Sequence, residues 1–133
     1  MPDLQAFTLP QAQLQQLLFV GRNLDFQSVA DQALTKVFSG TNYMVTSVSG
    51  VRKTGGATVA CAGGIYTAAA KAGNALVAAA QTWLLLTGSL GIQAGTPAVL
   101  ASAQNSATAF LSLTTGSTGA VTADVFVWGV VLD

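Results

Sequence analysis

The amino-acid sequence predicts an all-β protein, built as one antiparallel sandwich or barrel that follows a short N-terminal helix. Three observations support this prediction. The length of 133 residues suits a single domain with its own core. From about residue 28, short runs of β-branched, aromatic and aliphatic residues alternate with turn-forming residues. The last run, residues 122–132, is rich in the residue types that fit a pleated sheet.

The first 27 residues are expected to form a helical arm and a linker, ahead of a β-sandwich domain at residues 28–133. Pro10 suits the first position of a helix, because its missing N–H has no helical partner there. The spacing of Leu14, Leu17 and Leu18 places these side chains on one helix face. So short a helix is marginal alone. The three leucines should therefore contact either the sandwich of their own chain or a neighbouring molecule.

Turn signals divide the rest of the chain into about eight short strands. Gly and Asn adopt the positive φ angles of tight turns, and the pair Gly63-Gly64 indicates a bend or a bulge. Residues 116–119, Gly-Ser-Thr-Gly, are expected to form a hairpin turn into the last strand. The expected strands are residues 33–38, 43–51, 57–62, 65–68, 75–80, 83–87 and 109–115, a weak one at 99–100, and residues 122–132.

Two helical alternatives exist for the Ala-rich middle of the chain. Residues 66–86 contain many Ala, whose propensity favours a helix, but Gly73-Asn74 and β-branched neighbours oppose it, so strands are expected. Residues 75–92 approach the ~20 residues of a membrane-spanning helix. This window carries Gln, Thr, Ser and Gly and has no Lys or Arg at its far end, so no membrane span is expected.

The last strand is apolar on both faces, because successive side chains of a strand point in opposite directions. One face should fill the core, and the other needs a second cover. The bulkier set is assigned to the core, and the flatter set to a subunit interface, where glycine permits close backbone approach. The predicted core set is Phe126, Trp128, Val130 and Leu132; the predicted subunit interface is Val125, Val127, Gly129 and Val131. Cover by the N-terminal segment of the same chain is the alternative.

The charge of the chain is unusually low. Hydrophobic residues make up 51% of the sequence and charged residues 8%, against about 25% charged residues in a typical soluble domain. The formal net charge is zero, and the only basic pair is Arg52-Lys53. Nucleic-acid binding by charge is therefore not expected. A surface with so few charges favours self-association, so a homo-oligomer is expected.

Catalytic residues, cofactors and metal ions are not expected. Without His, a His-assisted base is impossible. Asp124, near the start of the last strand, is interpreted as a solvated or ion-paired charge. The single Cys61 allows neither an internal disulfide nor a zinc cluster and suits a buried core position. The first residues lack a basic region followed by an apolar run, so synthesis in the cytoplasm is expected.

Two stretches carry a resemblance to a known class of proteins. They are AGGIYTAAAKAGNALVAAAQ at residues 62–81, and FLSLT with TADVFVWGVVL at residues 110–114 and 122–132. They resemble small virion proteins of tailed bacteriophages with a jelly-roll or β-sandwich fold, among them head decoration (cement) proteins. The resemblance implies a single antiparallel β-sandwich of jelly-roll type that sits as an oligomer on the capsid shell. A trimer is the first oligomeric state to expect. The implied location is the virion, and the implied partner is the major capsid protein or another virion protein.

The alternative is a receptor- or carbohydrate-binding module of a phage fibre or tail. Such a module would present aromatic side chains on exposed loops, whereas the expected loops of this chain contain Gly, Ser, Thr and Ala. The sequence therefore favours a structural protein whose function depends on its surfaces.

Overall fold

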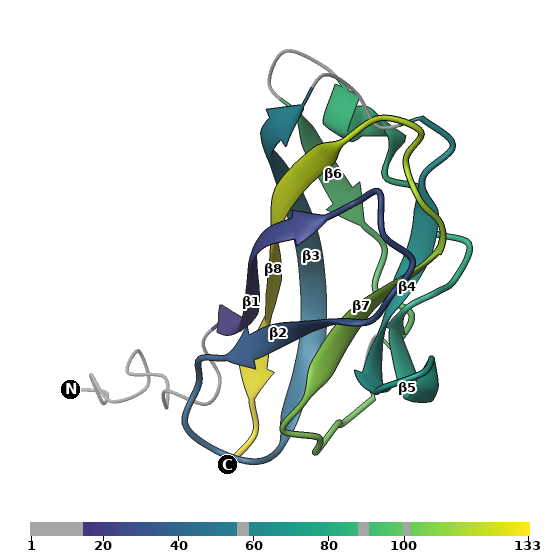
Figure 1. Cartoon of the computed structure of the whole chain (residues 1–133). Coiled ribbons are helices and arrows are strands. Elements are labelled where there is room, and N and C mark those ends of the chain that lie inside the picture. Colours follow the sequence, from purple (N-terminus) through teal and green to yellow (C-terminus); the bar gives the residue numbers. More distant parts are fainter. Residues whose placement is uncertain (1–14, 56–58, 88–90, 100–101) are drawn as a thin grey trace, which may run out of the picture.

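The computed structural model describes residues 15–55, 59–87, 91–99 and 102–133 (Figure 1). The all-β prediction is confirmed: the described residues form one antiparallel sheet of eight strands, curled into a half-barrel. The strands, with one short 3-10 helix, are β1 (Gln15–Asp25), β2 (Gln32–Lys36), β3 (Tyr43–Gly55), β4 (Ala62–Ala68), β5 (Ala72–Val77), η3 (Leu84–Thr87), β6 (Ile92–Gly95), β7 (Ala109–Thr115) and β8 (Val121–Val131).

The strands pair in a nested way. β1 pairs with β8, β2 with β7, β3 with β6 and β4 with β5, all antiparallel. These are the pairs of one long hairpin that has been rolled up. Rolling adds the pairs β8 with β3 and β7 with β4, and the pair of β1 with β2 joins the two halves into the order β5-β4-β7-β2-β1-β8-β3-β6. β7 and β8 do not pair, so the hairpin predicted at residues 116–119 is wrong.

β1 lies in the middle of the sheet, between β2 and β8. The predicted helix is wrong for the described part of this segment, and residues 15–25 belong to the sheet. A register shift between Leu17 and Phe19 lets Leu18 and Phe19 both enter the core, while Leu17 stays on the outer side, half-buried. The leucine spacing that indicates a helix face therefore also fits a bulged strand. Leu14 lies outside the described residues.

One apolar core fills the inside of the half-barrel and includes side chains from every strand except β6. Trp83 is fully buried, and its Nε1–H donates to the carbonyl oxygen of Gly63 at 3.0 Å. Its ring stands edge-to-face against Phe26, with the centroids 5.5 Å apart. A second group of edge-to-face rings joins Phe19, Phe38 and Tyr43. These large aromatic residues, none of which belongs to β8, thus occupy most of the space inside the curled sheet.

Several local predictions can be compared with the structure. The bulge expected at the glycine pair is present as a register shift between Ala62 and Gly63. The pair lies within one continuous strand, β4, instead of between two strands, and residues 59–61 of the expected strand 57–62 are not in a strand. The predicted strand at residues 83–87 is wrong, because residues 84–87 form η3. β6 lies between the expected strands at residues 83–87 and 99–100, where the sequence predicted no strand. Strands β4 and β5 exclude the helical alternative for the residues that they contain. No helix in the described parts of the chain is long and apolar enough to cross a membrane.

Removing residues 1–21 should unfold the protein, because it deletes most of a strand that joins the two halves of the sheet. We expect loss of the β signal in circular dichroism and loss of a cooperative thermal transition. A chain that starts at Gln15 keeps all of β1 and is the matched comparison. Retention of the β signal after removal of residues 1–21 would contradict the central position of β1.

Candidate interaction surface

The structure buries the face of β8 that was predicted to be a subunit interface. It leaves on the outside the face that was predicted to be the core because its side chains are bulkier. Val125 and Val127 are 0% exposed and Val131 is 2% exposed, inside the core of their own chain. Phe126, Trp128 and Val130 are half-buried on the outer side of the same strand, and Leu132 is 43% exposed. The assignment was wrong because aromatic side chains of other elements already fill the interior, which leaves room only for valines on β8.

Gly129 also faces inward, and its role is packing within the chain. A Cβ atom at this position would collide with the carbonyl oxygen of Met44 on β3 and would lie 2.6 Å from Cδ1 of Leu18. The close approach that glycine permits here is therefore between neighbouring strands of one sheet. It does not serve a contact with another subunit.

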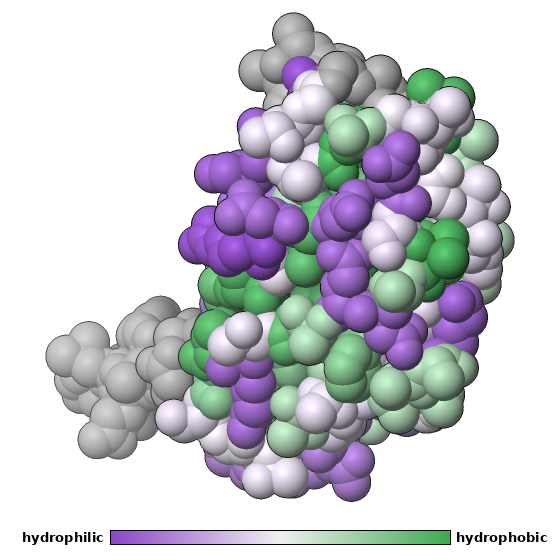
Figure 2. Space-filling view, in the orientation of Figure 1, coloured by the Kyte–Doolittle hydropathy of each residue, from purple (hydrophilic) through white to green (hydrophobic). Residues whose placement is uncertain are grey.

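The outward side chains of the three central strands form a surface that we call the outer apolar face. Strand pairing places its apolar residues opposite one another. Between β1 and β8, Leu17 pairs with Trp128 and Val20 with Phe126. Between β3 and β8, Met44 pairs with Val130. Directly paired residues lie on the same side of a sheet. All six side chains are half-buried. In the space-filling view, hydrophobic and hydrophilic side chains lie side by side on the displayed side of the molecule (Figure 2).

A cluster of charges lies at one end of the outer apolar face. Asp124 is on the outward side of β8 yet is only 3% exposed. Its Oδ2 lies 3.1 Å from Nη1 of Arg22 and 3.7 Å from Nζ of Lys53, and its Oδ1 accepts a hydrogen bond from the backbone N–H of Asn23 at 2.9 Å. The guanidinium carbon of Arg22 also lies 5.4 Å from the ring centroid of Phe126. The structure thus confirms the ion-paired interpretation of Asp124.

Two irregularities of the backbone produce this cluster. The register shift between Gly21 and Leu24 displaces β1 from β8, and Asn23 takes a positive φ of 52°, which Asn adopts more readily than most residues. A second register shift in β3 falls at Lys53. Burial acts to raise the pKa of Asp124, but the hydrogen bonds from Asn23 and Arg22 and the charge of Lys53 outweigh it and hold the pKa below its usual value.

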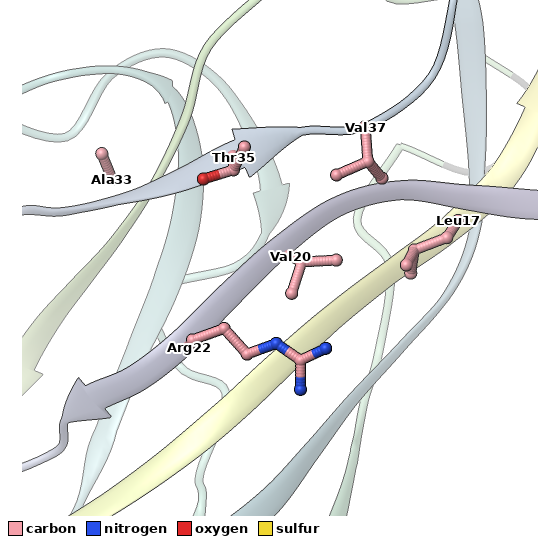
Figure 3. A pocket seen from close by; sticks show the side chains of 6 residues that line it. All are labelled: Leu17, Val20, Arg22, Ala33, Thr35 and Val37. Atoms are coloured by element: carbon pink, nitrogen blue, oxygen red, sulfur yellow. The ribbon is translucent and has the colours of Figure 1, made fainter.

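A groove of about 550 Å³ runs along the outer side of β1 and β2 (Figure 3). It is lined by Leu17, Val20 and Arg22 from the first strand and by Ala33, Thr35 and Val37 from the second strand and its end. In the close-up, the side chains of Leu17, Val20 and Arg22 project from β1 in a row. Val37 is 49% exposed. The groove therefore continues the outer apolar face and carries a cation at one end.

The Cys61 thiol and the Tyr43 hydroxyl are buried and neutral at pH 7. Burial raises the pKa of the Cys61 thiol to about 11 and that of the Tyr43 hydroxyl to about 12. Both side chains are 0% exposed. Among the described residues, no group of three Cys or Asp side chains is arranged to hold a metal ion. The chemistry that this surface offers is apolar contact, with one exposed guanidinium.

Sequence reasoning identified some of these residues but not their arrangement. Leu17 and Trp128 were both singled out, and the structure places them opposite each other on the outer apolar face. Arg22 and Lys53 were not linked to Asp124, because Arg22 is 102 positions away in the sequence and no local pattern connects them. The available signal was the charge itself, since a carboxylate on an otherwise apolar strand requires a partner.

Comparisons with known proteins give no match to any protein-family model, to any curated protein or to any solved structure.

Val127→Asp and Trp128→Asp should separate the two faces of β8. The first substitution buries an unpaired carboxylate in the core and should destabilise the fold by more than about 4 kcal/mol, which leaves insoluble protein. The second places a carboxylate at a half-exposed site and should leave a folded, soluble chain. Soluble yield and circular dichroism measure the difference. Soluble Val127→Asp together with insoluble Trp128→Asp would contradict the observed burial.

Asp124→Asn should destabilise the protein by about 1–2 kcal/mol at pH 7, because it removes a charged hydrogen-bond acceptor. The effect is no larger because the two cations that pair with Asp124 are exposed to water. The pKa of Asp124 is lowered in the folded state, so the stabilisation that it provides is fully present above the unfolded-state pKa and fades as the pH falls through and below that value. Urea midpoints of both proteins at pH 7 and pH 3 test this. A difference in midpoint that is equal at both pH values would contradict it.

Proposed function

We propose that this protein is a non-catalytic structural subunit of a bacteriophage particle, which decorates the capsid shell and contacts the major capsid protein. The observation that carries the proposal is the outer apolar face. Six apolar side chains lie half-buried on the outside of the middle of the sheet, beside Ser47 and Ser49 of β3, and an apolar surface of this kind favours a covering partner. The chain has a formal net charge of zero, so this cover must come mainly from apolar contact.

The finer fold that we propose is a jelly roll. Its two sheets would be β1-β8-β3-β6 and β2-β7-β4-β5, and the sheet order contains both sets, joined through β1 and β2. Jelly rolls of eight strands occur in viral capsid domains and also in lectins. This support rests on analogy of fold, which favours a virion protein without naming a partner.

The proposed mechanism is burial of the outer apolar face between copies and against the shell. Each square ångström of apolar surface removed from water contributes about 25 cal/mol. An interface of standard size can thus hold without many charged contacts, although its area alone does not fix its affinity. A trimer is the proposed assembly, on the basis of the resemblance to decoration proteins.

A carbohydrate-binding module of a fibre or tail is the second candidate, and one observation favours it. Phe126 and Trp128 are two positions apart on β8, so both point outward, and both are half-buried. Aromatic rings of this kind stack on sugars. Their position on the sheet instead of on loops differs from what was expected of such a module. Quenching of Trp fluorescence by added glycans would identify this function, because Trp83 is fully buried and Trp128 would report the change.

The wild-type protein should be an oligomer at micromolar concentration, with a mass near three times the 13.4 kDa of one chain. Trp128→Asp should shift the mass toward the single chain while the circular dichroism stays unchanged, because the substitution charges the outer apolar face. Light scattering measures the mass, and electron microscopy of the assembled particle locates the protein on the shell. A wild-type chain that stays monomeric and is absent from the shell would rule the proposal out.

A further inference from the structure

We propose that the groove between β1 and β2 binds the first nine residues of a neighbouring copy of this chain. This inference rests on the proposed function, because it assumes that copies assemble. It names the segment that would fill the groove: each copy would place its N-terminal segment in the groove of a neighbouring copy.

The groove selects for an apolar segment with a negative charge. Five of its six lining residues are uncharged, and the sixth is Arg22. The Arg22 side chain is 65% exposed, whereas that of Asp124 is 4% exposed. Arg22 donates Nη1–H to Asp124, and a guanidinium carries five N–H donors. Exposed donors therefore remain for a second carboxylate, which charge-assisted hydrogen bonds would hold.

The N-terminal sequence has this composition. Residues 1–9 read MPDLQAFTL and contain one carboxylate, Asp3, with no Lys or Arg. Leu4, Phe7 and Leu9 supply apolar side chains for the walls of the groove. Pro2 has no backbone N–H, so burying it leaves no donor without a partner, and it favours an extended conformation in the residue before it.

The geometry of β1 favours a neighbouring copy over the same chain. Both edges of β1 are occupied, by β2 and by β8, so a segment ahead of Gln15 cannot continue in the sheet beside it. The groove extends from Leu17 toward Arg22, away from the N-terminus. The chain's own segment would have to reverse its direction within residues 10–14. A segment from a neighbour needs no reversal. The five residues that connect it to β1, residues 10–14, span at most about 16–18 Å when extended, so the neighbour must lie directly beside the groove.

Crosslinking between two variants of the full chain, each with one added cysteine, tests this proposal. Folded Leu4→Cys and Thr35→Cys proteins are mixed and then oxidised without unfolding, so that Cys61, which is 0% exposed in the folded chain, stays protected. We expect a disulfide-linked product that contains one chain of each variant, identified by its mass. Ala79→Cys replaces Thr35→Cys in the matched control, because Ala79 is exposed and follows β5 at the edge of the sheet. A yield no higher than this control overturns the proposal, as does a Leu4→Cys/Thr35→Cys double variant that crosslinks only within one chain.

The charge of Asp3 gives an independent measurement. Asp3→Lys should raise the dissociation constant of the oligomer by about five-fold, since an exposed charge pair contributes at most about that factor, and added salt should reduce the difference. Asp3→Glu keeps the charge and should leave the constant unchanged. Equal constants for all three proteins overturn the proposal. If light scattering still shows an oligomer and electron microscopy still finds it on the shell, only this inference fails. A monomer that is absent from the shell removes the proposed function as well.

Discussion

The pairing of β1 with β8 is the contact on which the rest of the structure depends. These strands carry the register that runs from Gln15 opposite Val130 to Asp25 opposite Thr122. The free edge of β8 takes up β3 and then β6, and the free edge of β1 takes up β2, β7, β4 and β5. Since β1 and β8 lie at opposite ends of the chain, the sheet cannot close around its core until almost the whole chain is present.

This contact also decides which surface the protein offers to others. β8 turns Val125, Val127 and Val131 to the interior. It turns its two aromatic side chains to the exterior, where β1 and β3 add apolar neighbours. The outer apolar face is therefore a consequence of how the core is filled. A buried carboxylate, Asp124, borders it and is held by cations from both flanking strands, so a group of three charges marks one end of the apolar surface.

The low charge and the rolled sheet are consistent with each other. A chain with five positive and five negative residues has few means to repel copies of itself, and the proposed assembly by burial of the outer apolar face would use that property. The groove beside this face extends the same argument to the N-terminal segment. Its apolar walls and its single guanidinium match the composition of the residues that precede β1.

The sequence by itself determined the strand content and several strand positions, because β-branched runs and glycine-rich turns act locally. Residues 109–115 are an example, for which the expected and observed strands coincide. The tertiary structure decided the rest. Leu17 and Leu18 fit a helix face equally well until β2 and β8 pair with both edges of β1. Likewise, which face of β8 is buried depends on Trp83, Phe26 and Tyr43 having filled the interior, and competition for that volume is a property of the whole fold.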